Sequence, residues 1–193
     1  MRSQDAMGLP NNRKQIGLKE AETIFEKVYA TNHWKKGDGS GKDSDPHEVH
    51  EFFPVLTNLL QKYEIKTFVD YGCGSHKVFS EYDFPDGVLY KGYDASAIAL
   101  ERAKKNARNE TLQFERLGDF RNLTETGDMI MLKDVICHWQ LDLVSEFIEH
   151  CSPLFKHILI VGAVTTTECD IVLQNTKEKF YIKSNRQYGI YLL

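Results

Sequence analysis

The sequence has little of what marks several large classes of proteins. Its four cysteines are Cys73, Cys137, Cys151 and Cys169. No two of them have C-x-x-C spacing, and none forms a zinc-ligand cluster with a nearby histidine, so we expect free thiols and no metal site. No apolar run approaches the ~18 residues that a membrane span needs, and the N-terminus lacks the hydrophobic segment of a signal peptide. These absences predict a cytoplasmic protein that makes no use of a membrane.

An excess of basic residues is also lacking. The 193 residues include 24 Lys and Arg against 28 Asp and Glu, and the formal net charge at pH 7 is -4. A protein that grips nucleic acid through a broad surface usually carries a basic face, so nucleic acid is a disfavoured partner. Hydrophobic residues make up 41% and charged residues 27% of the chain, which is the balance of a globular protein with one core.

The chain divides into a leader and one expected domain. Residues 1–13 are polar, contain a glycine and a proline, and show no hydrophobic period, so we expect a disordered leader. Residues 14–193 are expected to form a single domain. Within it, residues 14–63 would supply N-terminal helices and a lid loop, and residues 64–193 would form the core.

Two helices are expected before the core. Residues 14–32 carry apolar side chains near helical spacing, with Glu and Lys on the other face. Residues 33–46 are rich in Gly, Ser and Asp and predict a loop. A second helix is expected to begin after Asp45, which can cap it, and to end near Tyr63. Pro54 predicts a kink or a break in that helix.

From residue 66 onward, strand patterns alternate with helix patterns. The expected strands span residues 66–71, 88–93, 111–116, 129–133 and 157–161. The expected helices span residues 95–108 and 141–151, with a weaker one at 75–82. Such alternation implies crossovers that cover both faces of a parallel sheet. The predicted fold class is therefore α/β: a Rossmann-like, doubly wound, mostly parallel sheet. Residues 177–193 add an antiparallel C-terminal hairpin at its edge.

A carboxylate followed by two glycines ends the first expected strand. The segment reads Asp70-Tyr71-Gly72-Cys73-Gly74. Ligands of open parallel sheets lie outside the carboxyl ends of the strands, and glycine lets a ligand approach the backbone closely. We therefore expect Asp70, Gly72 and Gly74 to bind a small ligand, with Asp70 suited to an ammonium group or a water-bridged contact.

Acidic residues after the next two strands suggest a nucleoside. Asp94 ends the second expected strand, where a carboxylate can accept both hydroxyls of a ribose, although it could also simply cap the following helix. Asp119 follows the third strand, where it could read an adenine amino group or merely occupy a turn. A dinucleotide turn needs a small third residue, and Lys77 stands in that position, which disfavours an NAD-dependent oxidoreductase.

Together these segments resemble class I S-adenosylmethionine-dependent methyltransferases. "VDYGCG" is similar to their motif I, "GYDAS" to the acidic motif of the second strand, and "GDF" to the adenine-contacting motif. "HWKKGDGSGKDS" resembles the W-G-S-G lid of one group of small members, and "LKDVICHW" resembles the K-D-V-L-x-H-W signature after their fourth strand. The resemblance covers residues 33–163. It departs at Ser75 and His76, where that group often has an acidic residue and a tryptophan.

The resemblance implies S-adenosyl-L-methionine as the cofactor and assigns residues to it. These are Trp34, Gly39, Ser40, Gly41, Asp70, Gly72, Gly74, Asp94, Ala95, Asp119, Phe120, Lys133 and Asp134. Trp34 and the glycines after it would form a lid over the cofactor, or Trp34 would only anchor the loop. Asp134 and His138 are assigned to catalysis. His138 has an ordinary pKa near neutrality and could take a proton from the acceptor, or it could only shape the loop.

The resemblance implies methyl transfer. A short chain with no large inserted domain suggests a small pocket, so the expected acceptor is a small molecule. One alternative is an RNA or cap methyltransferase, since Lys133 and Asp134 resemble a lysine and aspartate that activate a ribose hydroxyl there; the acidic net charge counts against it. Another alternative is a non-catalytic module on the same fold that binds the cofactor or a partner. The unusual Ser75 and His76 keep this second alternative open.

Overall fold

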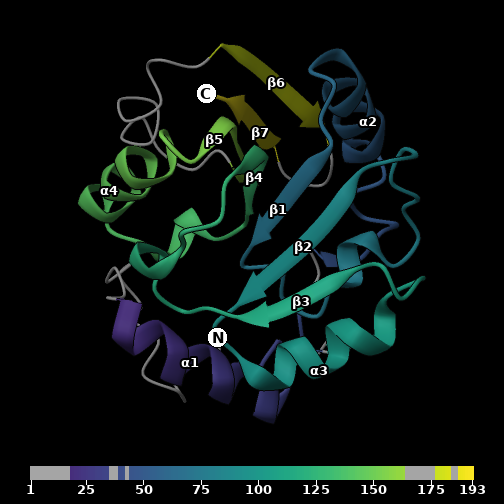
Figure 1. The fold of residues 1–193 in the computed structure, drawn as a ribbon. Coiled ribbons are helices and arrows are strands. Elements are labelled where there is room, and N and C mark those ends of the chain that lie inside the picture. Colours follow the sequence, from purple (N-terminus) through teal and green to yellow (C-terminus); the bar gives the residue numbers. More distant parts are fainter. Residues whose placement is uncertain (1–17, 35–38, 42–43, 164–176, 184–186) are drawn as a thin grey trace.

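A computed structural model describes residues 18–34, 39–41, 44–163, 177–183 and 187–193 (Figure 1). In this part of the chain the centre is a seven-stranded sheet of order β3-β2-β1-β4-β5-β7-β6. The strands are β1 (Thr67–Tyr71), β2 (Leu89–Asp94), β3 (Gln113–Arg116), β4 (Gly127–Lys133), β5 (Phe155–Ala163), β6 (Glu178–Lys183) and β7 (Gln187–Leu192).

The first five strands pair in parallel, and β7 pairs antiparallel with both β5 and β6. This confirms the predicted fold class, including the antiparallel C-terminal hairpin at the edge of the sheet. All five strands expected from the alternating pattern are present, each with ends shifted by at most a few residues. The residues between β6 and β7 lie outside the described part of the chain.

Helices on opposite faces bury the two sides of the sheet. The helices are α1 (Leu18–Thr31), α2 (Phe52–Lys62), α3 (Ala97–Asn106) and α4 (Leu141–Cys151). Side chains of β4 alternate between two core clusters, because successive residues of a strand point to opposite faces. Met129 and Met131 pack in the cluster that contains α2, whereas Ile130 and Leu132 pack in the cluster that contains α4.

The second helix begins later than expected. Residues 45–51 form turns with i to i+3 hydrogen bonds, and the Asp45 carboxylate accepts from the His47 N–H at 3.1 Å instead of capping a helix. The helix begins at Phe52, so Pro54 falls in its first turn. Backbone N–H groups have no helical acceptor there, which is why proline is tolerated. The expected helix start was therefore wrong, and the break predicted by Pro54 is the start of α2 itself.

Two other expected helices are shorter in the structure. The segment 75–82 contains only a 3-10 turn, η3 (Lys77–Phe79), because His76 adopts a left-handed φ of 58° that a helix cannot include. Helix α3 spans Ala97–Asn106 in place of the expected 95–108, and it is capped by Ser96, whose Oγ accepts from the Ala99 N–H at 3.2 Å.

Among the described residues, no helix combines the length and apolar character needed to cross a membrane.

Candidate active site

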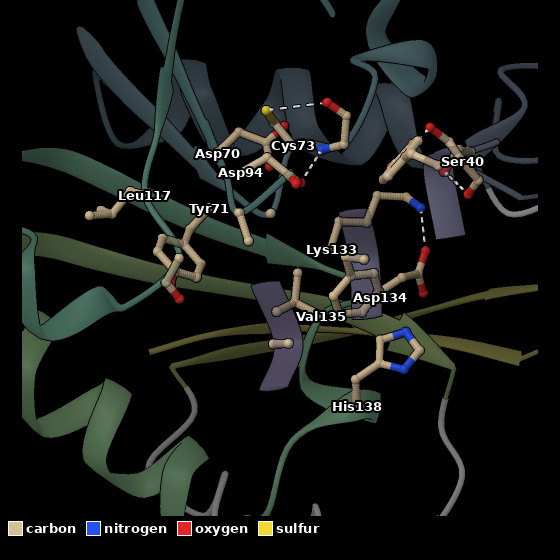
Figure 2. A pocket seen from close by; sticks show the side chains of 18 of the residues that line it. Ser40, Asp70, Tyr71, Cys73, Asp94, Leu117, Lys133, Asp134, Val135 and His138 are labelled. Atoms are coloured by element: carbon tan, nitrogen blue, oxygen red, sulfur yellow. Dashed lines mark hydrogen bonds and ion pairs between the residues drawn. The ribbon is translucent and has the colours of Figure 1, made fainter. Parts of the chain in front are cut away.

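A pocket opens where β1, β2 and β4 end, with α1 lying beside that edge of the sheet (Figures 1 and 2). It holds about 880 Å³ of empty space, and this volume includes open solvent at its mouth. From the first two strands it is lined by the predicted residues Asp70, Gly72, Gly74, Asp94 and Ala95. From the N-terminal segment and the end of β4 it is lined by the predicted residues Trp34, Ser40, Lys133, Asp134 and His138.

The turn after β1 has room for glycine only. Gly72 and Gly74 have φ angles of 82° and 57°, a region that other residues rarely adopt. A Cβ atom on Gly72 would overlap a methyl group of Val135, and one on Gly74 would come within 2.6 Å of the Tyr29 hydroxyl. The Gly72 and Cys73 N–H groups donate to the Tyr93 carbonyl at 2.7 and 2.9 Å and hold the turn against β2. At Gly72 and Gly74 the wall of the pocket is therefore formed by backbone atoms alone.

Asp94 joins the glycine turn to the end of β2. Its Oδ2 accepts from the Gly74 N–H at 2.9 Å, and its Oδ1 accepts from the Ser96 N–H at 2.8 Å. Burial raises its pKa to about 6, against the lowering effect of these backbone hydrogen bonds. Since Ser96 is the cap of α3, capping does not explain Asp94. A carboxylate has about four acceptor sites, so both oxygens can still accept from hydroxyl groups of a ligand in the pocket.

Asp70 lies at the base of the pocket in a chain of buried polar groups. Only 2% of its surface is exposed, and the Tyr90 hydroxyl donates to its Oδ2 at 2.8 Å. The Nδ1 atom of His76 lies 3.1 Å from that hydroxyl oxygen. Burial raises the pKa of Asp70 to about 7, while the Tyr90 hydrogen bond and the charge of Lys133 oppose the rise. Burial also lowers the pKa of His76 to about 4, so its ring is neutral near pH 7.

The end of β4 supplies a charged pair and an imidazole (Figure 2). Lys133 is 9% exposed, and its Nζ donates to Asp134 Oδ2 at 2.5 Å. Asp134 has a left-handed φ of 58°, and its N–H donates to the Val161 carbonyl at 2.8 Å. His138 lies next in the turn η5 (Ile136–His138). Burial lowers the pKa of His138, and the charge of Asp134 opposes this, so the imidazole is neutral near pH 7.

Ser40 ties the predicted lid to the glycine turn. Its Oγ lies 2.5 Å from the Ser75 Oγ and 3.2 Å from the Tyr29 hydroxyl, and it accepts from the Ser75 N–H at 3.3 Å. Gly39 and Gly41 have φ angles of 92° and 84° but do not line the pocket. Residues 35–38 and 42–43 of the lid segment lie outside the described part of the chain. Closure of a lid over a ligand therefore stays a prediction.

Besides Gly39 and Gly41, the predicted cofactor residues Asp119 and Phe120 also lie outside the pocket. The Asp119 Oδ1 accepts from the Arg121 N–H at 3.0 Å and caps the turn η4 (Phe120–Asn122). Phe120 is fully buried, with ring centroids of Trp139 and Phe147 at 5.6 and 5.2 Å. Leu117 and Gly118 from the same loop line the pocket instead. Contact of Asp119 with an adenine remains a prediction.

The sequence interpretation missed one wall of the pocket. Helix α1 lines it with Leu18, Ala21, Phe25 and Tyr29, spaced three or four residues apart. The helical spacing was visible in the sequence, but a core-facing stripe and a pocket-facing stripe have the same period. Tyr90 and His76 were missed for a different reason, because nothing local to either residue indicates that it supports Asp70.

Comparison with known proteins finds similar structures but no match to the sequence. No protein-family model matches the sequence, and no curated protein does. The structure resembles the magnesium protoporphyrin IX methyltransferase of Synechocystis PCC 6803 solved with SAH (S-adenosylhomocysteine), with a TM-score of 0.67 and 15% identity over 89% of this chain and 98% of that one.

Two further similar structures are of proteins from Leishmania major and from human. A SAM-dependent methyltransferase of Leishmania major gives a TM-score of 0.67 and 12% identity, over 91% of this chain and 82% of that one. Human N-acetylserotonin methyltransferase in complex with SAM gives 0.58 and 13% identity, over 92% of this chain and 59% of that one. Identities this low carry the architecture and not the activity. The chain has the fold of the class I SAM-dependent methyltransferases.

Proposed function

We propose that this protein transfers a methyl group from S-adenosyl-L-methionine to a small-molecule acceptor. The observation that carries the proposal is the hydrogen bond of 2.9 Å between Asp94 Oδ2 and the Gly74 N–H. It joins two segments that resemble separate cofactor motifs, 20 residues apart, at one end of one pocket. The same pocket is lined by apolar side chains together with a few polar groups, as small-molecule sites usually are.

The lining residues fit the chemical parts of this cofactor. Asp94 can accept from ribose hydroxyls, and Asp70 can pair with the ammonium group of the methionine part. The glycine turn leaves space for the backbone to approach the ligand. Leu117 and Gly118 offer an apolar surface at the same edge, where a base could pack. When bound, S-adenosylmethionine supplies an electrophilic methyl group on its sulfonium.

The chain itself has to align the acceptor, exclude water and accept a proton. Holding two reactants in alignment can lower an activation barrier by about 7–11 kcal/mol, so a shaped pocket can account for a large part of the rate enhancement. Helix α1 lines one wall of the site, mostly with apolar side chains. His138 holds a neutral imidazole near pH 7, since burial lowers its pKa. It can therefore accept a proton as the acceptor is methylated.

The charges of the pocket favour a small acceptor over a nucleic acid. Among the described residues, the lining contains the carboxyl groups of Asp70, Asp94 and Asp134 and one lysine, Lys133, which is bonded to Asp134. A polyanion requires basic contacts along its backbone. The formal net charge of -4 agrees with this choice.

Calorimetric titration with SAH tests the proposal, with NAD as the negative control. Gly72 and Gly87 form a matched pair, because both have a φ of 82° but Gly87 has no atom within 4 Å of an added Cβ. We expect SAH to bind the wild type and Gly87→Ala, and to bind Gly72→Ala at least about tenfold more weakly. Circular dichroism checks that both variants fold.

Absence of SAH and SAM binding to the wild type would end the proposal. Binding without methyl transfer across a broad panel of acceptors would instead support the non-catalytic module. Tight RNA binding that falls steeply with salt would support the RNA methyltransferase.

A further inference from the structure

Aromatic rings from three segments gather at one end of the pocket. Phe25 of α1, Trp34 after α1 and His138 of η5 all line it. The Phe25 ring lies edge-to-face against the His138 ring, with centroids 5.2 Å apart and an interplanar angle of 76°. The Phe25 and Trp34 centroids lie 6.5 Å apart at 49°. Rings arranged in this way favour a planar aromatic ligand, through stacking and edge contacts with it.

This aromatic end is separate from the end expected to hold the base of the cofactor. Figure 2 shows Leu117 and Tyr71 on one side of the pocket and His138 and Asp134 on the other. Lys133 lies between these sides, close to Asp134. A ligand that extends from Leu117 past Asp94 and the glycine turn would therefore present its far end to the aromatic rings. A second molecule could occupy the space beside them.

His138 offers unused hydrogen-bonding capacity to that second molecule. Neither of its ring nitrogens makes a hydrogen bond to the residues that the structure describes, and its recorded contacts are with the Phe25 ring and the charge of Asp134. A neutral imidazole has one nitrogen that accepts a hydrogen bond. The polar group that fits it best is an uncharged donor such as a hydroxyl.

The charges around this space disfavour an ionised molecule. Lys133, the lining cation, is bonded to Asp134 at 2.5 Å, so an incoming anion would have to compete with that carboxylate. The Lys133 side chain is 6% exposed and that of Asp134 28%, so the pair is partly buried, and drawing away one partner leaves a poorly solvated charge. An ammonium group would be attracted by Asp134, but a protonated nitrogen has no lone pair with which to attack a methyl group. An uncharged acceptor remains.

From these contacts we infer that the methyl acceptor is an uncharged aromatic hydroxyl compound, a phenol in chemical class. This inference rests on the proposed methyl transfer. The ring packs against Phe25 and Trp34, and its hydroxyl donates to a His138 nitrogen. In the reaction the phenol oxygen forms a bond to the methyl carbon as the carbon–sulfur bond breaks. Sulfur keeps the electron pair of that bond, and the phenol proton passes to His138. The products are an aryl methyl ether, SAH and a protonated imidazole.

Three probes of one size test this inference by calorimetry on protein saturated with SAH. 2-Naphthol is neutral and aromatic, 2-naphthoate is aromatic but anionic, and decahydro-2-naphthol is a neutral alcohol without aromatic rings. Aromatic pairs contribute about 0.5–1.5 kcal/mol each beyond the area they bury. Contacts with two rings should therefore make 2-naphthol bind about 5- to 150-fold more tightly than decahydro-2-naphthol. 2-Naphthoate has the same rings, so its weaker binding, by about tenfold, would come from its charge, which has to compete with Asp134 for Lys133.

Matched variants show which residues bind 2-naphthol. Phe25→Leu removes the ring and keeps most of its volume, so 2-naphthol affinity should fall by about tenfold, while SAH affinity stays unchanged. Phe53→Leu makes the same change on α2, in the core cluster on the other face of the sheet, and should change neither affinity. His138→Asn should reduce methyl transfer to 2-naphthol by about 100-fold with SAH affinity unchanged.

Two results would overturn the inference while leaving methyl transfer in place. One is binding of 2-naphthoate or decahydro-2-naphthol within about threefold of 2-naphthol. The other is unchanged 2-naphthol affinity in Phe25→Leu. Failure of the wild type to bind SAH would be a different outcome, because it would remove the proposed function itself and the inference with it.

Discussion

Removal of one hydroxyl group should shift the pH at which this protein binds SAH. The Tyr90 hydroxyl donates to Asp70 at 2.8 Å, and Asp70 has a pKa of about 7. An ammonium group of the ligand pairs with the ionised form of Asp70. Affinity for SAH should therefore increase as the pH rises from 6 to 8, through the pKa of this carboxyl group.

The size of the shift follows from the hydrogen bond that Tyr90→Phe removes. Hydrogen bonds to charged groups contribute about 1.5–3 kcal/mol, and one pKa unit corresponds to 1.36 kcal/mol. Loss of the hydroxyl should raise the pKa of Asp70 by about 1–2 units, because the bond favours the ionised carboxylate. The ionised fraction at pH 7 then falls from about one half to about 1–10%, which weakens SAH binding about 5- to 50-fold.

The other groups that face Asp70 stay in place in this variant. Lys133 lowers its pKa and Asp94 raises it, and neither residue changes. His76 loses its contact with the Tyr90 hydroxyl but is neutral near pH 7, because burial lowers its pKa to about 4. The shift in the pH profile can therefore be assigned to Asp70.

Calorimetry with SAH at half-unit steps from pH 6 to 8.5 measures the effect. Tyr82→Phe is the control, since its hydroxyl lies 2.8 Å from Thr57 Oγ1 in the same core cluster and has no recorded contact with Asp70. Its midpoint should match the wild type. If the profiles of wild type and Tyr90→Phe coincide, Asp70 does not bind the ammonium group, and the reasoning from this hydrogen bond is refuted.

Three further substitutions test other parts of the site. Asp94→Asn should weaken SAH binding by about 10- to 100-fold because it removes a charged acceptor, while Asp83→Asn, at an exposed carboxylate paired with Arg108, should change the affinity far less; equal losses would contradict the assignment of Asp94. Asp70→Asn should raise the melting temperature of the free protein at pH 8 more than at pH 4. Its folded pKa of about 7 lies above the ordinary 3.8, so the stability that protonated Asp70 contributes is present at pH 4, is lost as pH rises to about 7, and is absent at pH 8; an equal change at both pH values would refute this. Ser40→Ala removes contacts with Ser75 and should speed SAH dissociation in stopped-flow by about two- to tenfold; an unchanged rate would exclude a role for Ser40 in retaining the ligand.

The sequence by itself determined the architecture of this protein. The apolar runs of β4 and β5 are continuous because both faces of a parallel sheet are buried, and continuous runs separated by helical patterns predict such a sheet. The two glycines after Asp70 indicated positive φ angles, and Gly72 and Gly74 have them. The last 17 residues indicated a hairpin, which the described part of β6 and β7 confirms. These features are local, since they depend on neighbours within one element.

The ends of helices and the orientation of loops depended on competing hydrogen bonds and contacts, which the pattern of apolar residues in the sequence does not show. Asp45 was a plausible cap, yet its side chain bonds within a turn and α2 begins at Phe52. Asp119 and Phe120 fell in a segment that resembles a cofactor motif, but the loop turns so that Leu117 and Gly118 line the pocket. A rotation of the chain by one residue in a loop changes which side chain points inward, and no periodicity fixes that rotation.

Only the tertiary structure decided which residues support the site. In the β1–β2 register Phe68 lies opposite Tyr90 and Asp70 lies opposite Gly92. Side chains two residues apart share a face of a strand, so Tyr90 lies diagonally beside Asp70 and its hydroxyl reaches the carboxylate. In the same way α1 brings Phe25 to His138 from more than 100 residues away in the sequence. Such pairs form because distant elements bury a common surface, and the sequence near either residue carries no record of the other.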